Sequence, residues 1–253
     1  MFSVLVTGAN RGIGLAFVRQ LLSSAKPPVN IFACCRTPEN AVELQSIANS
    51  NSSVTVLKLD LSDKLTYEDA VKRVEPVVGE QGLSLLINNA GVDSFGINVE
   101  NTSAEEAERV FKVNVTGTLG VTLAFLPSLR RSAKFTCSDE DTMSIEKSAI
   151  VNITSHLGSI SLHKDKNITN TPYKVSKAAL NMLTNCMSID FAADGILAVA
   201  MSPGWVQTDM GGKDEAPLTP KESVCGMLAT LDKLKGLEAS GKCHGYNGDI
   251  LSW

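Results

Sequence analysis

The sequence predicts an α/β fold in which a mostly parallel sheet of seven strands carries helices on both faces. Short apolar runs alternate with longer amphipathic stretches almost from end to end of the 253 residues. The apolar runs are rich in Val, Ile and Leu and lack polar alternation, as expected of strands that are buried on both faces. Alternation of strands and helices implies right-handed crossovers and a doubly wound sheet. No linker or composition break divides the chain, so we expect one domain over residues 1–253.

The apolar runs that fit strands cover residues 2–7, 30–35, 53–59, 83–87, 148–154, 196–202 and 246–251. The amphipathic stretches between them predict helices at about 12–24, 38–49, 64–79, 104–131, 173–194 and 221–235. Two segments fit neither pattern. Residues 132–147 are polar and predict a surface loop, and residues 209–220 carry Gly and Pro and predict a mobile loop beside a ligand site.

Composition excludes several classes of protein. A formal net charge of -4 argues against a general affinity for nucleic acid. No run approaches the roughly 18 apolar residues of a membrane span, and no targeting signal is visible, so we expect a cytoplasmic protein. The six cysteines show no CxxC pair and the three histidines fall in no metal motif, which predicts reduced thiols and no metal site.

A glycine-rich turn joins the first predicted strand to the first helix. Gly8, Gly12 and Gly14 lie where a doubly wound sheet binds a dinucleotide, with the pyrophosphate at the helix N-terminus. Glycine allows a tight turn and a close approach of backbone to phosphate. A glycine motif alone also fits an ordinary strand-to-helix turn. Its place at the first such junction favours a cofactor site and a Rossmann-type domain.

The end of the second strand predicts which nucleotide binds. Sites that prefer NAD usually place an acidic residue there for the ribose 2′-hydroxyl. Here Cys35 is followed by Arg36, and Arg11 lies inside the glycine turn. Two guanidinium groups without a carboxylate favour a 2′-phosphate, and hence NADP(H), although both could be solvated surface residues.

Two further stretches fit the same site. Asp60 ends the third strand, where it can receive the adenine amino group. The small-residue stretch 88–91, Asn-Asn-Ala-Gly, ends the fourth strand, where the backbone can pass under a ribose. Either stretch alone fits a simple turn or a helix cap.

A strand-end serine and a Tyr–Lys pair predict the chemistry. Ser155 leaves the strand at 148–154, at the sheet edge where ligands collect, and can hydrogen-bond a carbonyl oxygen. Tyr173 and Lys177 are four residues apart and so share one helical face. A nearby ammonium stabilises a phenolate and brings the phenol pKa down from about 10 toward working pH. A Tyr–Lys pair alone is usually a surface pattern; the glycine turn and the serine make proton transfer the better interpretation.

Together these residues resemble the short-chain dehydrogenase/reductase family over nearly the whole chain. The finer resemblance is to sniffer-type carbonyl reductases. It rests on Thr7-Gly-Ala-Asn-Arg-Gly12, Cys35-Arg36, Pro203-Gly-Trp-Val-Gln-Thr-Asp-Met-Gly-Gly212 and the terminal Trp253, while the stretch 88–91 and Asn114 belong to the family resemblance.

The resemblance implies a role for each matching residue. Tyr173 is implied as the general acid in reduction, Lys177 as the residue that holds the nicotinamide ribose, and Ser155 as the ligand of the substrate oxygen. Asn114 is implied to position a water in the proton relay. The implied cofactor path comprises Gly8, Asn10, Arg11, Gly12, Ile13, Gly14, Arg36, Asp60, Leu61, Asn88, Ala90, Gly91, Tyr173, Lys177, Pro203, Gly204, Val206 and Thr208.

The substrate pocket is less well defined by the sequence. Its candidate residues are Ser155, Phe95, His156, Trp205 and Met210, with Leu157 as a further apolar neighbour. The interval between Ser155 and Tyr173 is a few residues longer than in the shortest family members, so substrate preference transfers less well than chemistry.

The sequence thus predicts an NADPH-dependent enzyme that reduces small aldehydes, ketones or quinones. The alternative is a non-catalytic Rossmann protein that senses NADP(H), but such a protein need not keep the residues for proton transfer. A methyltransferase is disfavoured by the Tyr–Lys pair and by Arg36. The resemblance also suggests a homo-oligomer, either a dimer or a tetramer, but the sequence does not distinguish these from a monomer.

Overall fold

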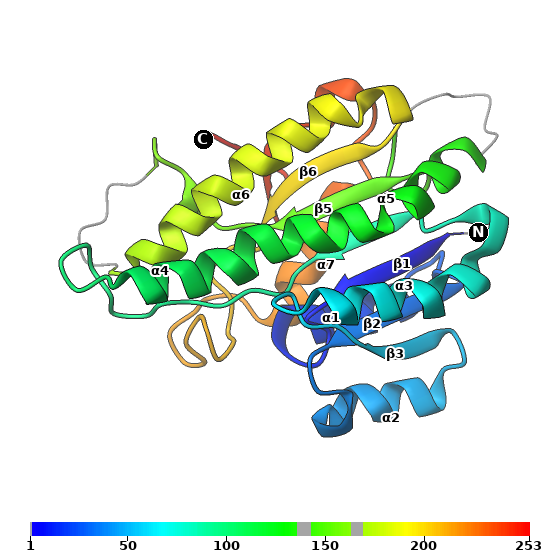
Figure 1. The fold of residues 1–253 in the computed structure, drawn as a ribbon, viewed down its shortest axis with the longest axis horizontal. Coiled ribbons are helices and arrows are strands. Elements are labelled where there is room, and N and C mark those ends of the chain that lie inside the picture. Colours follow the sequence, from blue (N-terminus) through cyan, green and yellow to red (C-terminus); the bar gives the residue numbers. More distant parts are fainter. Residues whose placement is uncertain (1, 136–142, 163–168) are drawn as a thin grey trace.

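A single sheet forms the centre of the molecule in this computed structural model, which describes residues 2–135, 143–162 and 169–253 (Figure 1). Within these residues the strand order is β3-β2-β1-β4-β5-β6-β7-β8. The strands are β1 (Ser3–Thr7), β2 (Asn30–Cys35), β3 (Val54–Lys58), β4 (Leu85–Asn88), β5 (Ala149–Ile153), β6 (Leu197–Ser202), β7 (Cys243–Gly245) and β8 (Ile250–Leu251). All neighbouring pairs are parallel except β7 and β8. The predicted doubly wound α/β class is confirmed, with one strand more than the seven expected.

Alternate residues of each central strand enter different cores. In β1, Val4 and Val6 belong to the core on one face of the sheet, while Leu5 belongs to the core on the other. All three side chains are fully buried. Apolar residues at every position are therefore required, which is why these strands lack polar alternation.

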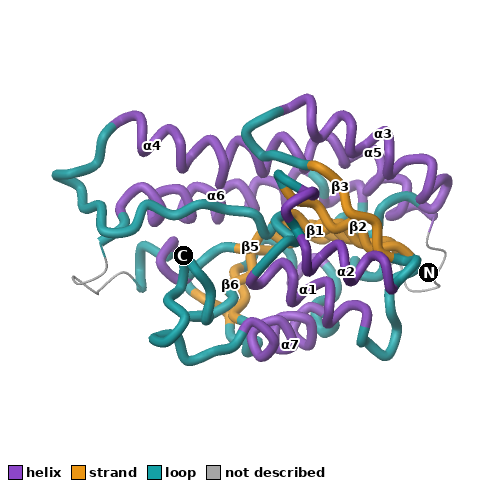
Figure 2. Tube along the Cα trace, turned by 90° about the horizontal axis from the view of Figure 1, so that it is seen from below, coloured by secondary structure: helices purple, strands orange, loops and turns teal. Residues whose placement is uncertain are grey.

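Helices cover both faces of the sheet (Figure 2). One face is covered by α1 (Gly12–Leu22), α2 (Val42–Ser50) and α7 (Pro220–Leu231), whose buried residues join the Val4 core. The other face is covered by α3 (Lys64–Val78), α5 (Thr118–Phe135) and α6 (Thr171–Asp190), which join the Leu5 core. A further helix, α4 (Ala104–Phe111), precedes α5 and packs on α6.

The helix predicted at 104–131 is not uniform. A π-helical segment, Lys112–Gly117, connects α4 to α5. The run Ala104–Phe135 is long and apolar enough to cross a membrane by length and composition, but half of its most apolar stretch is buried inside the protein. Core helices of globular proteins share that property. Gly117 allows the run to lie close to the end of β3, since a Cβ there would be 2.3 Å from the backbone oxygen of Leu61.

The C-terminal prediction of a strand over 246–251 is wrong. A turn occupies part of that range and separates β7 from β8. The Gly245 N–H donates to the Asp249 carbonyl at 2.8 Å, and Gly248 has φ of 91°. The sequence Asn247-Gly248-Asp249 is typical of a tight turn, but the prediction gave more weight to the apolar residues around it.

Two other boundaries differ from the predictions. The helix expected at 38–49 is split into a short 3-10 turn, Pro38–Asn40, and α2. The loop expected at 132–147 begins later, because α5 continues to Phe135. Ile145 and Lys147 are buried, so that part of the segment is not a surface loop; residues 136–142 lie outside the described residues.

Candidate active site

A cavity of about 1110 Å³ lies at the carboxyl end of the parallel strands. Its wall is formed by the glycine turn, the ends of β2 to β5, the first turns of α6 and the loop after β6. It includes the point between β1 and β4 where the strand order reverses, which is where doubly wound sheets bind ligands. Its volume exceeds the roughly 300–1,000 Å³ of pockets for one drug-sized ligand.

The glycine turn forms one end of the cavity. Gly8 and Gly12 have φ of 66° and 54°, which residues with a Cβ rarely adopt. A Cβ on Gly14 would lie 2.1 Å from the carbonyl oxygen of Gly8. The side chain of Arg11, the N-cap residue, does not cap α1, so the first N–H groups of this helix are available to an anion at its N-terminus. This cradle fits a dinucleotide pyrophosphate.

The ends of β1 and β4 are fixed to each other beside this turn. Thr7 Oγ1 accepts hydrogen bonds from the backbone N–H groups of Asn89 and Ala90, each at 3.0 Å. Asn89 Nδ2 in turn donates to the carbonyl of Thr7 at 2.9 Å. The contacts of Asn89 and Ala90 with Thr7 therefore hold the cavity floor in place.

Arginines lie on the rim of the same end. Arg36 is exposed and lines the cavity where a ribose 2′-phosphate is expected. Burial alone would raise the pKa of Asp60, but hydrogen bonds from Ser62 and the charge of Arg36 hold it below its usual range. Arg11 forms an ion pair with Asp209 from the loop after β6, and Lys213 contacts the same carboxylate at 3.0 Å.

Tyr173, Lys177 and Ser155 meet at the other end. Ser155 lies two residues after the end of β5, and its hydroxyl accepts from the Leu157 N–H at 3.2 Å and lies close enough to Tyr173 to lower the pKa of the phenol. Lys177 Nζ lies 5.5 Å from the centre of the Tyr173 ring and donates to the Ile153 carbonyl at 2.8 Å. Tyr173 and Lys177 are 8% and 5% exposed, so both polar groups act in a largely dehydrated environment.

Burial controls the protonation of this pair. It raises the pKa of the Tyr173 phenol, the charge of Asp93 raises it further, and only the nearby Ser155 hydroxyl lowers it. Burial lowers the pKa of Lys177 to about 8, against a smaller opposite effect of Asp93. We expected the Lys177 ammonium to bring the pKa of the Tyr173 phenol down, but within the protein alone that pKa is raised. At neutral pH the Tyr173 hydroxyl keeps its proton and can donate it.

Asn114 lies behind the pair in the π-helical segment. Its Oδ1 accepts from the Val92 N–H at 2.8 Å, and its Nδ2 donates to the Val92 carbonyl at 2.9 Å and to Ser176 Oγ at 3.0 Å. Asn114 is 1% exposed and does not line the cavity. In this structure its side chain ties the loop after β4 to α6.

All but two of the residues predicted for the site line the cavity. The exceptions are Asn114 and Asn88. Asn88 donates to Asn152 at 2.8 Å and to Thr122 at 3.1 Å inside the core. The residues that line the cavity as predicted are Gly8, Asn10, Arg11, Gly12, Ile13, Gly14, Arg36, Asp60, Leu61, Ala90, Gly91, Phe95, Ser155, His156, Tyr173, Lys177, Pro203, Gly204, Trp205, Val206, Thr208 and Met210.

The polar wall residues that were not predicted include Asp93, Arg109 and Asn170. Asp93 follows the stretch 88–91 by two residues, so a charged residue just after a strand end was the available signal. Arg109 lies on α4 and Asn170 just before α6, and nothing in the sequence indicates that either faces the same cavity.

Comparison with known proteins identifies the family. The pattern of the family described as short chain dehydrogenase matches residues 3–218. This chain belongs to that family. Membership confirms the resemblance inferred from the motifs and makes the chain an oxidoreductase.

Solved structures of carbonyl reductases are similar over the full length. The carbonyl reductase from chicken fatty liver, solved with NADPH bound, is 40% identical, with 99% of this chain and 98% of that chain covered and a TM-score of 0.93. The carbonyl reductase Sniffer of D. melanogaster is 35% identical, with both chains fully covered and a TM-score of 0.94. Among sequence relatives, C-signal of Myxococcus xanthus is 37% identical over 171 residues, which is 68% of this chain and 93% of that protein.

Proposed function

We propose that this protein reduces aldehydes, ketones or quinones with NADPH, and that Tyr173 is the general acid. The observation that carries the proposal is a buried Tyr173 that lines the same cavity as Ser155, Lys177 and the glycine cradle. The similarity to the chicken and D. melanogaster carbonyl reductases supports the substrate class.

NADPH, when bound, supplies a hydride to the carbonyl carbon. Ser155 and Tyr173 hold the carbonyl oxygen, and the Tyr173 hydroxyl donates its proton to that oxygen as negative charge develops. Lys177 binds the nicotinamide ribose, and its positive charge stabilises the phenolate that remains. The raised pKa of Tyr173 suits the direction of reduction, because a proton donor must carry its proton at neutral pH.

The test of the mechanism is Tyr173→Phe, with Tyr67→Phe as the matched control. Tyr67 is also buried, but its hydroxyl donates to the Leu61 carbonyl, away from Ser155. Reduction of a panel of carbonyl compounds is followed as loss of NADPH absorbance. We expect Tyr173→Phe to lose at least about 100-fold in kcat with NADPH affinity retained, and Tyr67→Phe to keep its turnover. Full turnover by Tyr173→Phe contradicts the mechanism. Tight NADPH binding without turnover by the unaltered protein supports the sensor alternative.

The preference for NADPH over NADH is proposed to depend on Arg36. Loss of a charge-assisted hydrogen bond to a phosphate costs about 10- to 100-fold. Arg36→Ala is therefore expected to lose that factor in kcat/KM for NADPH and little for NADH. Arg19→Ala is the control, since Arg19 lies on α1 and pairs with Glu43 outside the cavity. Equal efficiency of the unaltered protein with both cofactors contradicts the assignment.

A further inference from the structure

We propose that Asp93 and Asn170 form a subsite that binds a positively charged amino group of the substrate, so that the preferred substrates are carbonyl compounds that carry an ammonium group. The inference rests on the proposed function, because it concerns the substrate of the same cavity. Both residues line the cavity together with Ser155 and Tyr173.

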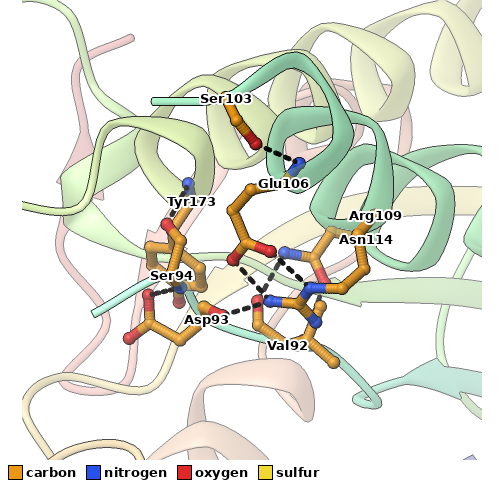
Figure 3. Close-up of polar contacts among 8 residues, drawn as sticks. All are labelled: Val92, Asp93, Ser94, Ser103, Glu106, Arg109, Asn114 and Tyr173. Atoms are coloured by element: carbon orange, nitrogen blue, oxygen red, sulfur yellow. Dashed lines mark hydrogen bonds and ion pairs between the residues drawn. The ribbon is translucent and has the colours of Figure 1, made fainter. Parts of the chain in front are cut away.

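The loop after β4 holds Asp93 in a fixed position beside Tyr173 (Figure 3). Ser94 Oγ accepts from the Tyr173 N–H at 3.2 Å, and the Ile97 carbonyl accepts from the Thr171 N–H at 2.8 Å. On its other side the loop is held at Val92 by Asn114. A carboxylate held at both sides needs little reorganisation to bind a ligand.

The side chain of Asn170 lies next to this carboxylate and carries an acceptor that lacks a partner among the described residues. Asp93 Oδ1 accepts from the Ser94 N–H at 2.6 Å and from Asn170 Nδ2 at 3.2 Å. The second contact fixes the amide orientation, since a flipped amide would place two acceptors against each other. Asn170 Oδ1 is buried without a hydrogen-bond partner in the described part of the chain, and Asn170 is 4% exposed. A buried acceptor without a partner needs a donor from elsewhere.

Neighbouring cations do not occupy the carboxylate. Arg109 contacts Glu106 through two hydrogen bonds of 2.7 Å and reaches only the backbone oxygen of Asp93 (Figure 3). Lys177 donates to the Ile153 carbonyl. Across the described residues, hydrogen bonds to the Asp93 carboxylate reach Oδ1 alone. Burial raises the pKa of Asp93, against smaller effects of its hydrogen bonds and of Lys177 and Arg109.

The chemistry of the ligand follows from these groups. A carboxylate and an amide oxygen are both acceptors, so they match a group with N–H donors and a positive charge. An anionic substituent would meet the carboxylate as a like charge. The subsite therefore selects among carbonyl compounds, while Tyr173 and Ser155 act on the carbonyl in each case.

Three substituted benzaldehydes test this selection. The cationic probe is 4-(dimethylaminomethyl)benzaldehyde, whose tertiary amine cannot condense with the aldehyde. Its neutral isostere is 4-isobutylbenzaldehyde, and 4-carboxybenzaldehyde is the anionic probe. We expect kcat/KM to favour the cation over the isostere by about 10- to 100-fold and the anion to be the poorest. Asp93→Asn is expected to bring the cation-to-isostere ratio close to one, and Asn170→Ala to reduce it. Asp69→Asn, on the exposed face of α3, is the matched control and should keep the ratio.

A binding measurement separates this inference from the proposed function. The corresponding benzamides carry the same substituents and are not reduced, so calorimetry with NADP+ present reports recognition alone. Tighter binding of the cationic benzamide supports the subsite even when no aldehyde is turned over. Absence of turnover contradicts only the proposed function. Equal affinity of the two benzamides for the unaltered protein overturns the subsite, as does a cation-to-isostere ratio that Asp93→Asn leaves unchanged. The calorimetric comparison uses the unaltered chain, so it remains decisive when Asp93→Asn does not fold.

Discussion

Lys177→Met is expected to stabilise the protein at neutral pH while it removes activity. Burial lowers the pKa of Lys177 from 10.5 to about 8, which corresponds to roughly 3 kcal/mol of lost stability at pH values below 8. Methionine fills a similar volume without charge. Loss of the hydrogen bond to the Ile153 carbonyl costs about 1–2 kcal/mol. The net gain is about 1–2 kcal/mol.

The sign of the effect depends on pH. The folded protein releases the Lys177 proton near pH 8, and the unfolded chain releases it near pH 10.5. Between these values the unfolded chain binds more protons, so the stability of the unaltered protein rises with pH. The advantage of Lys177→Met is therefore full below pH 8 and is lost by about pH 10.5.

Guanidinium denaturation at pH 7 and pH 10, together with NADPH consumption, measures both effects. In thermal unfolding the gain at pH 7 corresponds to a Tm increase of about 3–6 °C. Lys64→Met, at an exposed position of α3, is the control and should change stability by less than about 0.5 kcal/mol. A Lys177→Met variant that is less stable than the unaltered protein at pH 7, or a stability difference that does not vary with pH, would refute the reasoning.

Two further changes test the glycine turn and the thiols. Gly14→Ala places a Cβ 2.1 Å from a backbone oxygen and should cost about 3 kcal/mol in the free energy of unfolding as well as NADPH affinity. Gly79→Ala has open space around the new Cβ and should cost about 1–3 kcal/mol of backbone strain, but it should leave NADPH binding intact. Similar losses of NADPH affinity in both variants would count against the cradle. In a Cys137→Ser background, we expect the exposed Cys186 and Cys225 to react with a thiol reagent in the native state, and the other described cysteines to react only on unfolding. A third native-state thiol reacting at the same rate would contradict the burial that the structure assigns.

The central sheet could be predicted from the sequence because its strands are buried on both faces. The predicted and observed bounds of β2 coincide at residues 30 and 35, where every position but the first is buried. The same analysis predicted the C-terminal strands wrongly. They are short and lie at the sheet edge, so the turn at Asn247-Gly248-Asp249 decides the structure more than the apolar residues do.

The residues of the candidate active site could be predicted from the sequence, but the directions of their pKa shifts could not. Ser155, Tyr173 and Lys177 were recognised from their spacing, which fixes where they lie on the strand and helix. The pKa directions depend on how completely each group is buried, and the position of Asp93 depends on how one loop docks on α6. Neither quantity is encoded in a local pattern.

The π-helical segment Lys112–Gly117 sets the angular relation between the two helices that it joins. A π-helical turn takes up one extra residue, so the helices on its two sides keep the angular relation of an uninterrupted α-helix that is one residue shorter. Val110 of α4 and Val121 of α5, which lie on either side of this segment, are both fully buried. A chain one residue shorter in this segment should therefore keep both helices packed but should displace Asn114, whose side chain binds Val92 and Ser176.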